Sequence, residues 1–132
     1  MKLVVYGFQL TPPMLQSVVL RFQLGSITRY NMEHIFIQQG IPENWVLTPN
    51  QIRFPKHQKI GKSVRPAACM ADRVIQALKQ FGYIKQNGAG WVWQSTLIEL
   101  TPNEASNFAS AFLGNNFQVA LSAYKQPKPS PV

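Results

Sequence analysis

Few side chains in this sequence are suited to catalysis. The chain of 132 residues has five carboxylic acids, two histidines and a single cysteine. Acid–base or nucleophilic chemistry needs paired carboxylates, or a nucleophile beside a base. His34 and His57 lie in different segments without metal-ligand spacing, and Cys69 is most simply a structural thiol. There is no glycine-rich phosphate loop. The sequence therefore predicts a protein with no catalytic residues, no cofactor and no metal site.

The binding of anions is the chemistry that the charge favours. The net charge is +8 and the isoelectric point is about 10.0, because acids are scarce. Between Glu43 and Asp72 there is no acid, and cations there recur at every third position. Pro55 and Gly61 favour an extended chain, which can follow a phosphate backbone and release its counterions. The predicted phosphate-binding residues of this basic segment, 53–65, are Arg53, Lys56, Lys59, Lys62 and Arg65. The alternative is a solvated surface loop.

A helix predicted over 66–81 follows the basic segment directly. Its apolar residues recur at helical spacing, so one side would be buried and the other exposed. The exposed side would carry three side chains of the types that contact bases and phosphates, namely Arg73, Gln76 and Lys79. Asp72 on the same side repels phosphate, although it could accept from a cytosine amine or pair with Arg73. An ordinary amphipathic helix remains the alternative.

A β-hairpin is predicted over 83–100, after this helix. Asn87-Gly88 favours the turn, since both residues accept positive φ, and the glycine at 90 indicates a loop slightly longer than two residues. Lys85 is placed to reach a phosphate. Trp91 and Trp93 lie two apart and share one face of a strand, which is either core or an exposed surface for stacking bases. We expect at least one of the two in the core.

Local signals predict the remaining elements. Thr11-Pro12 opens a helix, and Thr101-Pro102-Asn103-Glu104 is a capping box. The expected elements are a strand over 2–10, helices over 12–23, 28–39 and 102–113, a long connection over 42–65 anchored by Trp45, and a strand over 117–124. Residues 1–124 would form a single α+β domain, and 125–132 a flexible proline-rich tail. Without a signal peptide or an apolar span, we expect a cytoplasmic protein.

The helix, hairpin and capping box together resemble winged helix–turn–helix domains. Leu78, Gly82, Tyr83 and Ile84 match the end of the third helix in that superfamily, and Leu100–Pro102 matches the segment that often starts the next helix. The resemblance implies three helices plus a β-hairpin wing, to which this chain adds terminal strands. The connection of about 25 residues between the second and third helices departs from the short turn that these domains usually have.

The favoured function is therefore binding of DNA by a small protein that regulates transcription or the replication of a mobile element, with a homodimer as a plausible form. The helix 66–81 would enter the groove, Lys85 and the tip of the hairpin would reach phosphates or the minor groove, and the basic segment would follow the phosphate backbone. Two alternatives remain open. One is RNA or single-strand binding with stacking on Trp91 or Trp93. The other is a protein-interaction module, such as a phage-encoded inhibitor, whose basic surface meets an acidic protein.

Overall fold

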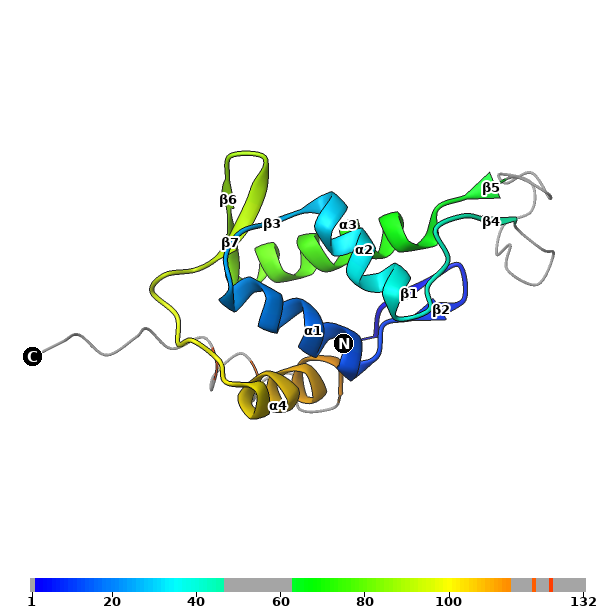
Figure 1. Ribbon diagram of the computed structural model, residues 1–132. Helices are drawn as coiled ribbons and strands as arrows, with labels where there is room; N and C mark the ends of the chain where they lie inside the picture. Colours follow the sequence, from blue (N-terminus) through cyan, green and yellow to red (C-terminus); the bar gives the residue numbers. More distant parts are fainter. Residues whose placement is uncertain (1, 47–62, 115–119, 121–123, 125–132) are drawn as a thin grey trace, which may run out of the picture.

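The computed structural model describes residues 2–46, 63–114, 120 and 124. The fold is α+β, with four helices and short antiparallel strands in this part of the chain. Figure 1 shows α1 lying between α4 on one side and the pair of α2 and α3 on the other. This arrangement confirms the predicted α+β class and places each predicted helix.

Each helix begins where the local sequence signals it. Helix α1 spans Pro12–Gln23 and α3 spans Pro66–Gln80, each with proline in the first turn. Helix α2 spans Arg29–Gln38 and α4 spans Pro102–Leu113, and both have a reciprocal capping box. In α4, Glu104 N donates to Thr101 Oγ1 over 3.3 Å, and Thr101 N donates back to Glu104 Oε1 over 3.2 Å. The capping box predicted for α4 is confirmed.

A three-stranded antiparallel sheet joins the predicted hairpin to the helices. Its strand order is β3 (Ile27–Thr28), β7 (Gly90–Trp93) and β6 (Ile84–Asn87). Asn87 pairs with Gly90, so the loop has only two residues and not the longer one expected. Of the loop residues only Gly88 has positive φ, as a type II′ turn requires. A side chain at Gly90 would place its Cβ 2.6 Å from the Ile27 carbonyl oxygen, so glycine allows β3 to pair with β7.

The N-terminal segment is a hairpin and not the single strand predicted over 2–10. Strand β1 (Val4–Val5) pairs with β2 (Phe8–Gln9), and the turn between them places Tyr6 at φ 51° and Gly7 at φ 86°. The prediction failed because tyrosine rarely adopts positive φ, so that the turn has no clear sequence signal. The apolar residues on either side of the turn therefore read as one continuous strand.

The described ends of the long connection form a second β-ribbon. Strand β4 (Trp45–Val46) pairs antiparallel with β5 (Ser63–Val64). The Trp45 ring packs edge-on against Phe8, with 5.2 Å between ring centroids, in agreement with its predicted anchoring role. In Figure 1 this ribbon leaves the N-terminal end of α3, and the β6–β7 hairpin projects from the opposite end.

The strand predicted over 117–124 is wrong at the two positions that the structure describes. Ala120 and Tyr124 have helical backbone. Ala120 is fully buried, and the Tyr124 ring meets Phe108 edge-on at 5.6 Å. Alternating apolar and polar residues predicted the strand, but packing against α4 decides the conformation. The extra C-terminal strand is therefore not formed at these positions.

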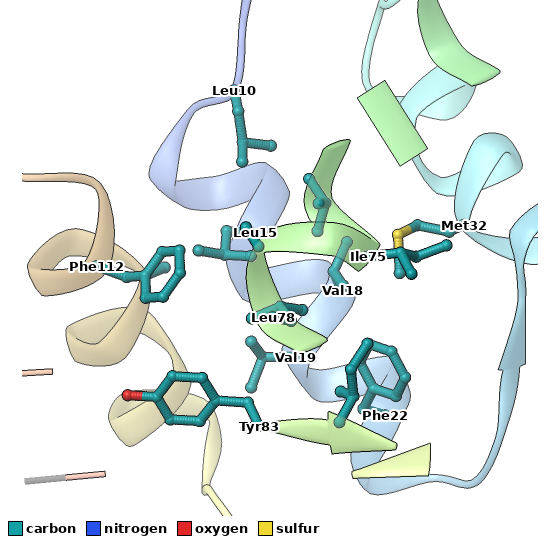
Figure 2. Close-up of a cluster of buried hydrophobic side chains, with 14 of the residues drawn as sticks. Leu10, Leu15, Val18, Val19, Phe22, Met32, Ile75, Leu78, Tyr83 and Phe112 are labelled. Atoms are coloured by element: carbon teal, nitrogen blue, oxygen red, sulfur yellow. The ribbon is translucent and has the colours of Figure 1, made fainter. Parts of the chain in front are cut away.

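The hydrophobic core lies where the helices meet the sheet. Figure 2 shows side chains from α1, α2, α3 and α4 converging with Tyr83, which precedes β6. Tyr83 is fully buried and stacks on Trp93 with 5.7 Å between ring centroids, and its hydroxyl donates to the Ala120 carbonyl over 3.0 Å. The Tyr83 ring also meets Phe108 of α4 edge-on at 5.0 Å, which fixes the base of the hairpin against α4. Burial also raises the pKa of Tyr83 from 10.0 to about 12.

Replacing Tyr83 with phenylalanine is expected to change how stability responds to alkaline pH. A raised pKa in the folded state stabilises the protein below pH 10, and this contribution is lost as the pH rises from 10 through about 12. The free energy of unfolding should therefore fall less steeply over this window in Tyr83→Phe than in wild type. At neutral pH the variant loses roughly 1–3 kcal/mol, because the Ala120 carbonyl loses its hydrogen bond.

Urea unfolding followed by tryptophan fluorescence between pH 8 and 12 measures both effects. Lysines also titrate in this window, so the matched control is Tyr30→Phe, which removes an exposed tyrosine and should keep the wild-type slope. Identical slopes for the two variants would contradict the role given to Tyr83.

Candidate nucleic-acid interface

The solvent-exposed side of α3 is a continuous polar surface. Its opposite side is buried against α2, the sheet and the core. At 100° per residue, the exposed residues fall within roughly 120° of arc around the helix axis. They are Asp72, Arg73, Gln76, Lys79 and Gln80, hereafter the α3 face. The structure thus exposes the three helix residues predicted to bind nucleic acid, Arg73, Gln76 and Lys79, on one side of the helix.

The β6–β7 hairpin projects past the C-terminal end of α3 (Figure 1) and carries further exposed polar side chains. Lys85, Gln86 and Asn87 are exposed along β6, and Figure 1 shows the hairpin projecting beyond the helices. All three side chains can donate hydrogen bonds, and Lys85 adds a positive charge. Lys85 is therefore exposed to solvent, and its ammonium group can reach a phosphate of a bound nucleic acid.

The two hairpin tryptophans face inward. Trp93 is buried, packs against Tyr83, Phe22 and Phe108, and donates its indole N–H to the Ile98 carbonyl over 3.2 Å. Trp91 is half-buried against the same core, and its Nε1 atom is covered without a hydrogen-bond partner. The expectation of at least one core tryptophan is confirmed. In this conformation Trp91 offers no exposed indole N–H to a base.

Arg65, the last cation of the basic segment, has a structural partner. Its guanidinium donates to the Glu33 carboxylate over 2.6 Å, and Glu33 is only 3% exposed. Arg65 is the N-cap residue of α3 and Glu33 lies on α2, so the ion pair joins the two helices. Next to it, Ala67 N donates to the Pro42 carbonyl over 3.1 Å. These two contacts join the start of α3 to α2 and to the segment that follows α2, although a long connection separates the two helices in sequence.

Arg29, a residue that the sequence did not single out, borders the α3 face. It is the first residue of α2, and its Nε atom lies 3.8 Å from the Asp72 Oδ1 atom. Asp72 thus pairs across the helices and not with Arg73, its neighbour in sequence. The sequence has little to indicate that Arg29 lies at this surface, since only the packing of α2 on α3 brings Arg29 and Asp72 together. The other predicted cations, Arg53, Lys56, Lys59 and Lys62, and the tail 125–132 lie outside the described residues.

A shallow hollow of about 530 Å³ lies on the outer side of α2, between Arg21 of α1 and the residues Tyr30, His34 and Gln38. Tyr30 is 66% exposed, and its ring meets His34 edge-on at 4.4 Å. A second hollow, of about 310 Å³, lies between the end of α1 and β7. Neither includes a residue of the α3 face.

Comparison of the chain with protein-family models, curated proteins and solved structures gives no match. Within the part of the chain that the structure describes, no three histidine, cysteine or acidic side chains gather as metal ligands do. In that same part, every helix is too short or too polar to cross a membrane.

Proposed function

We propose that this chain is a non-enzymatic nucleic-acid-binding protein of the winged-helix kind, with duplex DNA as its favoured ligand. Helix α3 is the groove-facing element and the β6–β7 hairpin is the wing. The observation that carries the proposal is the exposed polar face of α3, together with a projecting hairpin that follows α3 in the chain and bears Lys85. Regulation of transcription or replication is the expected context.

The order of elements supports the winged-helix architecture. Helices α2 and α3 pack together, and α3 leads straight into the hairpin. Strand β3, immediately before α2, pairs with the second strand of the hairpin. The wing is therefore fixed at both ends to the helix pair, which gives α3 and the wing a defined relative position.

The dimensions of α3 suit a major groove. Its 15 residues make a rod of about 22 Å at 1.5 Å per residue, and the major groove is wide enough to admit an α-helix. Arginine pairs with guanine edges and glutamine with adenine edges, so Arg73 and Gln76 are the candidates for reading sequence. Lys79 and Lys85 are candidates for phosphate contact.

Duplex DNA is favoured over a single strand because of how the two hairpin tryptophans lie. Binding of single strands relies on exposed aromatic rings on which bases stack. Trp93 is buried, and Trp91 is half-buried with a covered Nε1 atom. The polar helix face is thus a better match to a groove than the hairpin is to unstacked bases.

The proposal predicts salt-dependent binding of duplex DNA by the wild-type protein. Fluorescence anisotropy should be measured with a labelled 30-base-pair duplex of mixed sequence and with one of its single strands, across 50–200 mM salt. We expect tighter binding to the duplex. The logarithm of the association constant should fall with the logarithm of the salt concentration, with a slope of about −1.8 or steeper, which corresponds to two or more phosphate contacts. Equal or tighter binding to the single strand would favour the RNA or single-strand alternative. Binding to neither would favour a protein partner.

A further inference from the structure

Asp72 is a carboxylate in the middle of a surface otherwise built to meet a polyanion. It is the one acidic residue in the sequence of α3, and it shares the exposed side with Arg73, Gln76 and Lys79. Its side chain is 58% exposed. A carboxylate at this position acts against the attraction of its neighbours, so its effect on binding needs an explanation.

The contact between Asp72 and Arg29 is loose. The Arg29 Nε atom is 3.8 Å from Asp72 Oδ1, and the Arg29 side chain is 46% exposed. Exposed ion pairs at such a separation contribute little to stability. A phosphate oxygen is a stronger partner for a guanidinium, which can bind it through two parallel hydrogen bonds. Arg29 also begins α2, where the positive end of the helix dipole adds to the attraction. A DNA phosphate can therefore replace Asp72 as the ion-pair partner of Arg29.

Once Arg29 contacts a phosphate, Asp72 loses its partner while the negative charge of the DNA stands close by. An ionised carboxylate has no proton to donate, so it can only accept hydrogen bonds. Among base edges in the major groove, the cytosine N4 amine is the donor that acidic side chains accept from. At most positions on a duplex the phosphates therefore repel the Asp72 carboxylate. Where a cytosine amine faces it, the carboxylate accepts a hydrogen bond from that amine.

We infer that Asp72 is a specificity-determining residue of the α3 face. It weakens binding to arbitrary duplex sequence, and it selects sites that present a cytosine amine. The inference rests on the proposed function and adds the means of discrimination, since the repulsive element rejects wrong sites while Arg29, Lys79 and Lys85 attract every site equally.

The test compares Asp72→Asn with Glu104→Gln. Both substitutions remove one negative charge, and glutamine can replace glutamate in the α4 capping box. Anisotropy with a mixed-sequence 30-base-pair duplex at 50 mM salt should show Asp72→Asn binding tighter than Glu104→Gln by about threefold, which corresponds to removing a like charge roughly 7 Å from one phosphate in water. Selection from a pool of randomised duplexes should enrich cytosine at one position with wild type, and lose that preference with Asp72→Asn.

A further pair of variants separates two effects of Asp72 on DNA binding, namely its direct repulsion of phosphates and its ion pair with Arg29. In an Arg29→Gln background, Asp72→Asn should still tighten binding. Loss of the effect there would overturn the direct role of Asp72. Equal affinities of Asp72→Asn and Glu104→Gln, or an unchanged selected sequence, would also overturn it while leaving the proposed function in place. If wild type and both variants fail to bind any duplex, the proposed function falls and this inference falls with it.

Discussion

Replacing Arg65 with alanine is expected to lower the free energy of unfolding by roughly 2–4 kcal/mol, because it leaves a buried carboxylate without its partner. Glu33 is 3% exposed and its carboxylate accepts from the Arg65 guanidinium over 2.6 Å. Since Arg65 itself is about half exposed, water can partly replace it, and so the expected loss begins below the range for fully buried pairs. Urea unfolding at pH 7, followed by circular dichroism, measures the loss.

Two further variants test this explanation. Arg73→Ala removes the same charge from an exposed position on the same helix, and it should change the unfolding free energy by no more than about 0.5 kcal/mol. Adding Glu33→Gln to Arg65→Ala should recover part of the loss, since no buried charge then remains. If Arg65→Ala and Arg73→Ala have the same small effect, the ion pair does not hold α2 to α3.

This ion pair also changes the interpretation of the basic segment. In the sequence, Arg65 continues a regular series of cations and is indistinguishable from Lys62 or Lys59. In the structure it stabilises the junction of two helices. Reduced DNA binding by Arg65→Ala would therefore reflect a loosened α3 as well as a lost charge. Binding experiments on the cations should be paired with unfolding measurements for this reason.

The helices were predictable because their signals are local. Proline in the first turn, a capping threonine and an apolar stripe act within one or two helical turns, and α1, α3 and α4 begin at the expected residues. The exposed α3 face followed from the same periodicity. Locally encoded features therefore included the main part of the candidate site.

The features that were missed have no clear local sequence signal. Tyr6 adopts a positive φ that no turn rule assigns to tyrosine, and a predicted strand became a hairpin. Ala120 is helical and buried beneath the Tyr83 hydroxyl, although its segment alternates like a strand. Arg29 reaches Asp72 only because α2 packs on α3. Tertiary packing decides the cases of Ala120 and Arg29, and a single sequence does not show it.

The double variant Lys79→Ala/Lys85→Ala is expected to bind duplex DNA roughly 60-fold more weakly than wild type at 0.1 M salt. Each phosphate contact contributes about 0.9 to the slope of log K against log salt, so loss of two contacts removes about 1.8. If the two proteins bind equally at 1 M salt, this difference in slope makes the affinity of the variant roughly 60-fold lower at 0.1 M salt. Both lysines are exposed, one on α3 and one on the β6–β7 hairpin, so folding should be unaffected.

The matched control is Lys2→Ala/Arg21→Ala, which removes the same charge from residues outside α3 and the β6–β7 hairpin. Anisotropy titrations at several salt concentrations should show a nearly wild-type slope for the control pair, because only cations that neutralise phosphates release counterions. If the two double variants weaken binding and flatten the slope equally, DNA is responding to net charge and not to the α3 face. Binding would then be a consequence of the basic composition, and the assignment of α3 and the β6–β7 hairpin as the binding surface would be wrong.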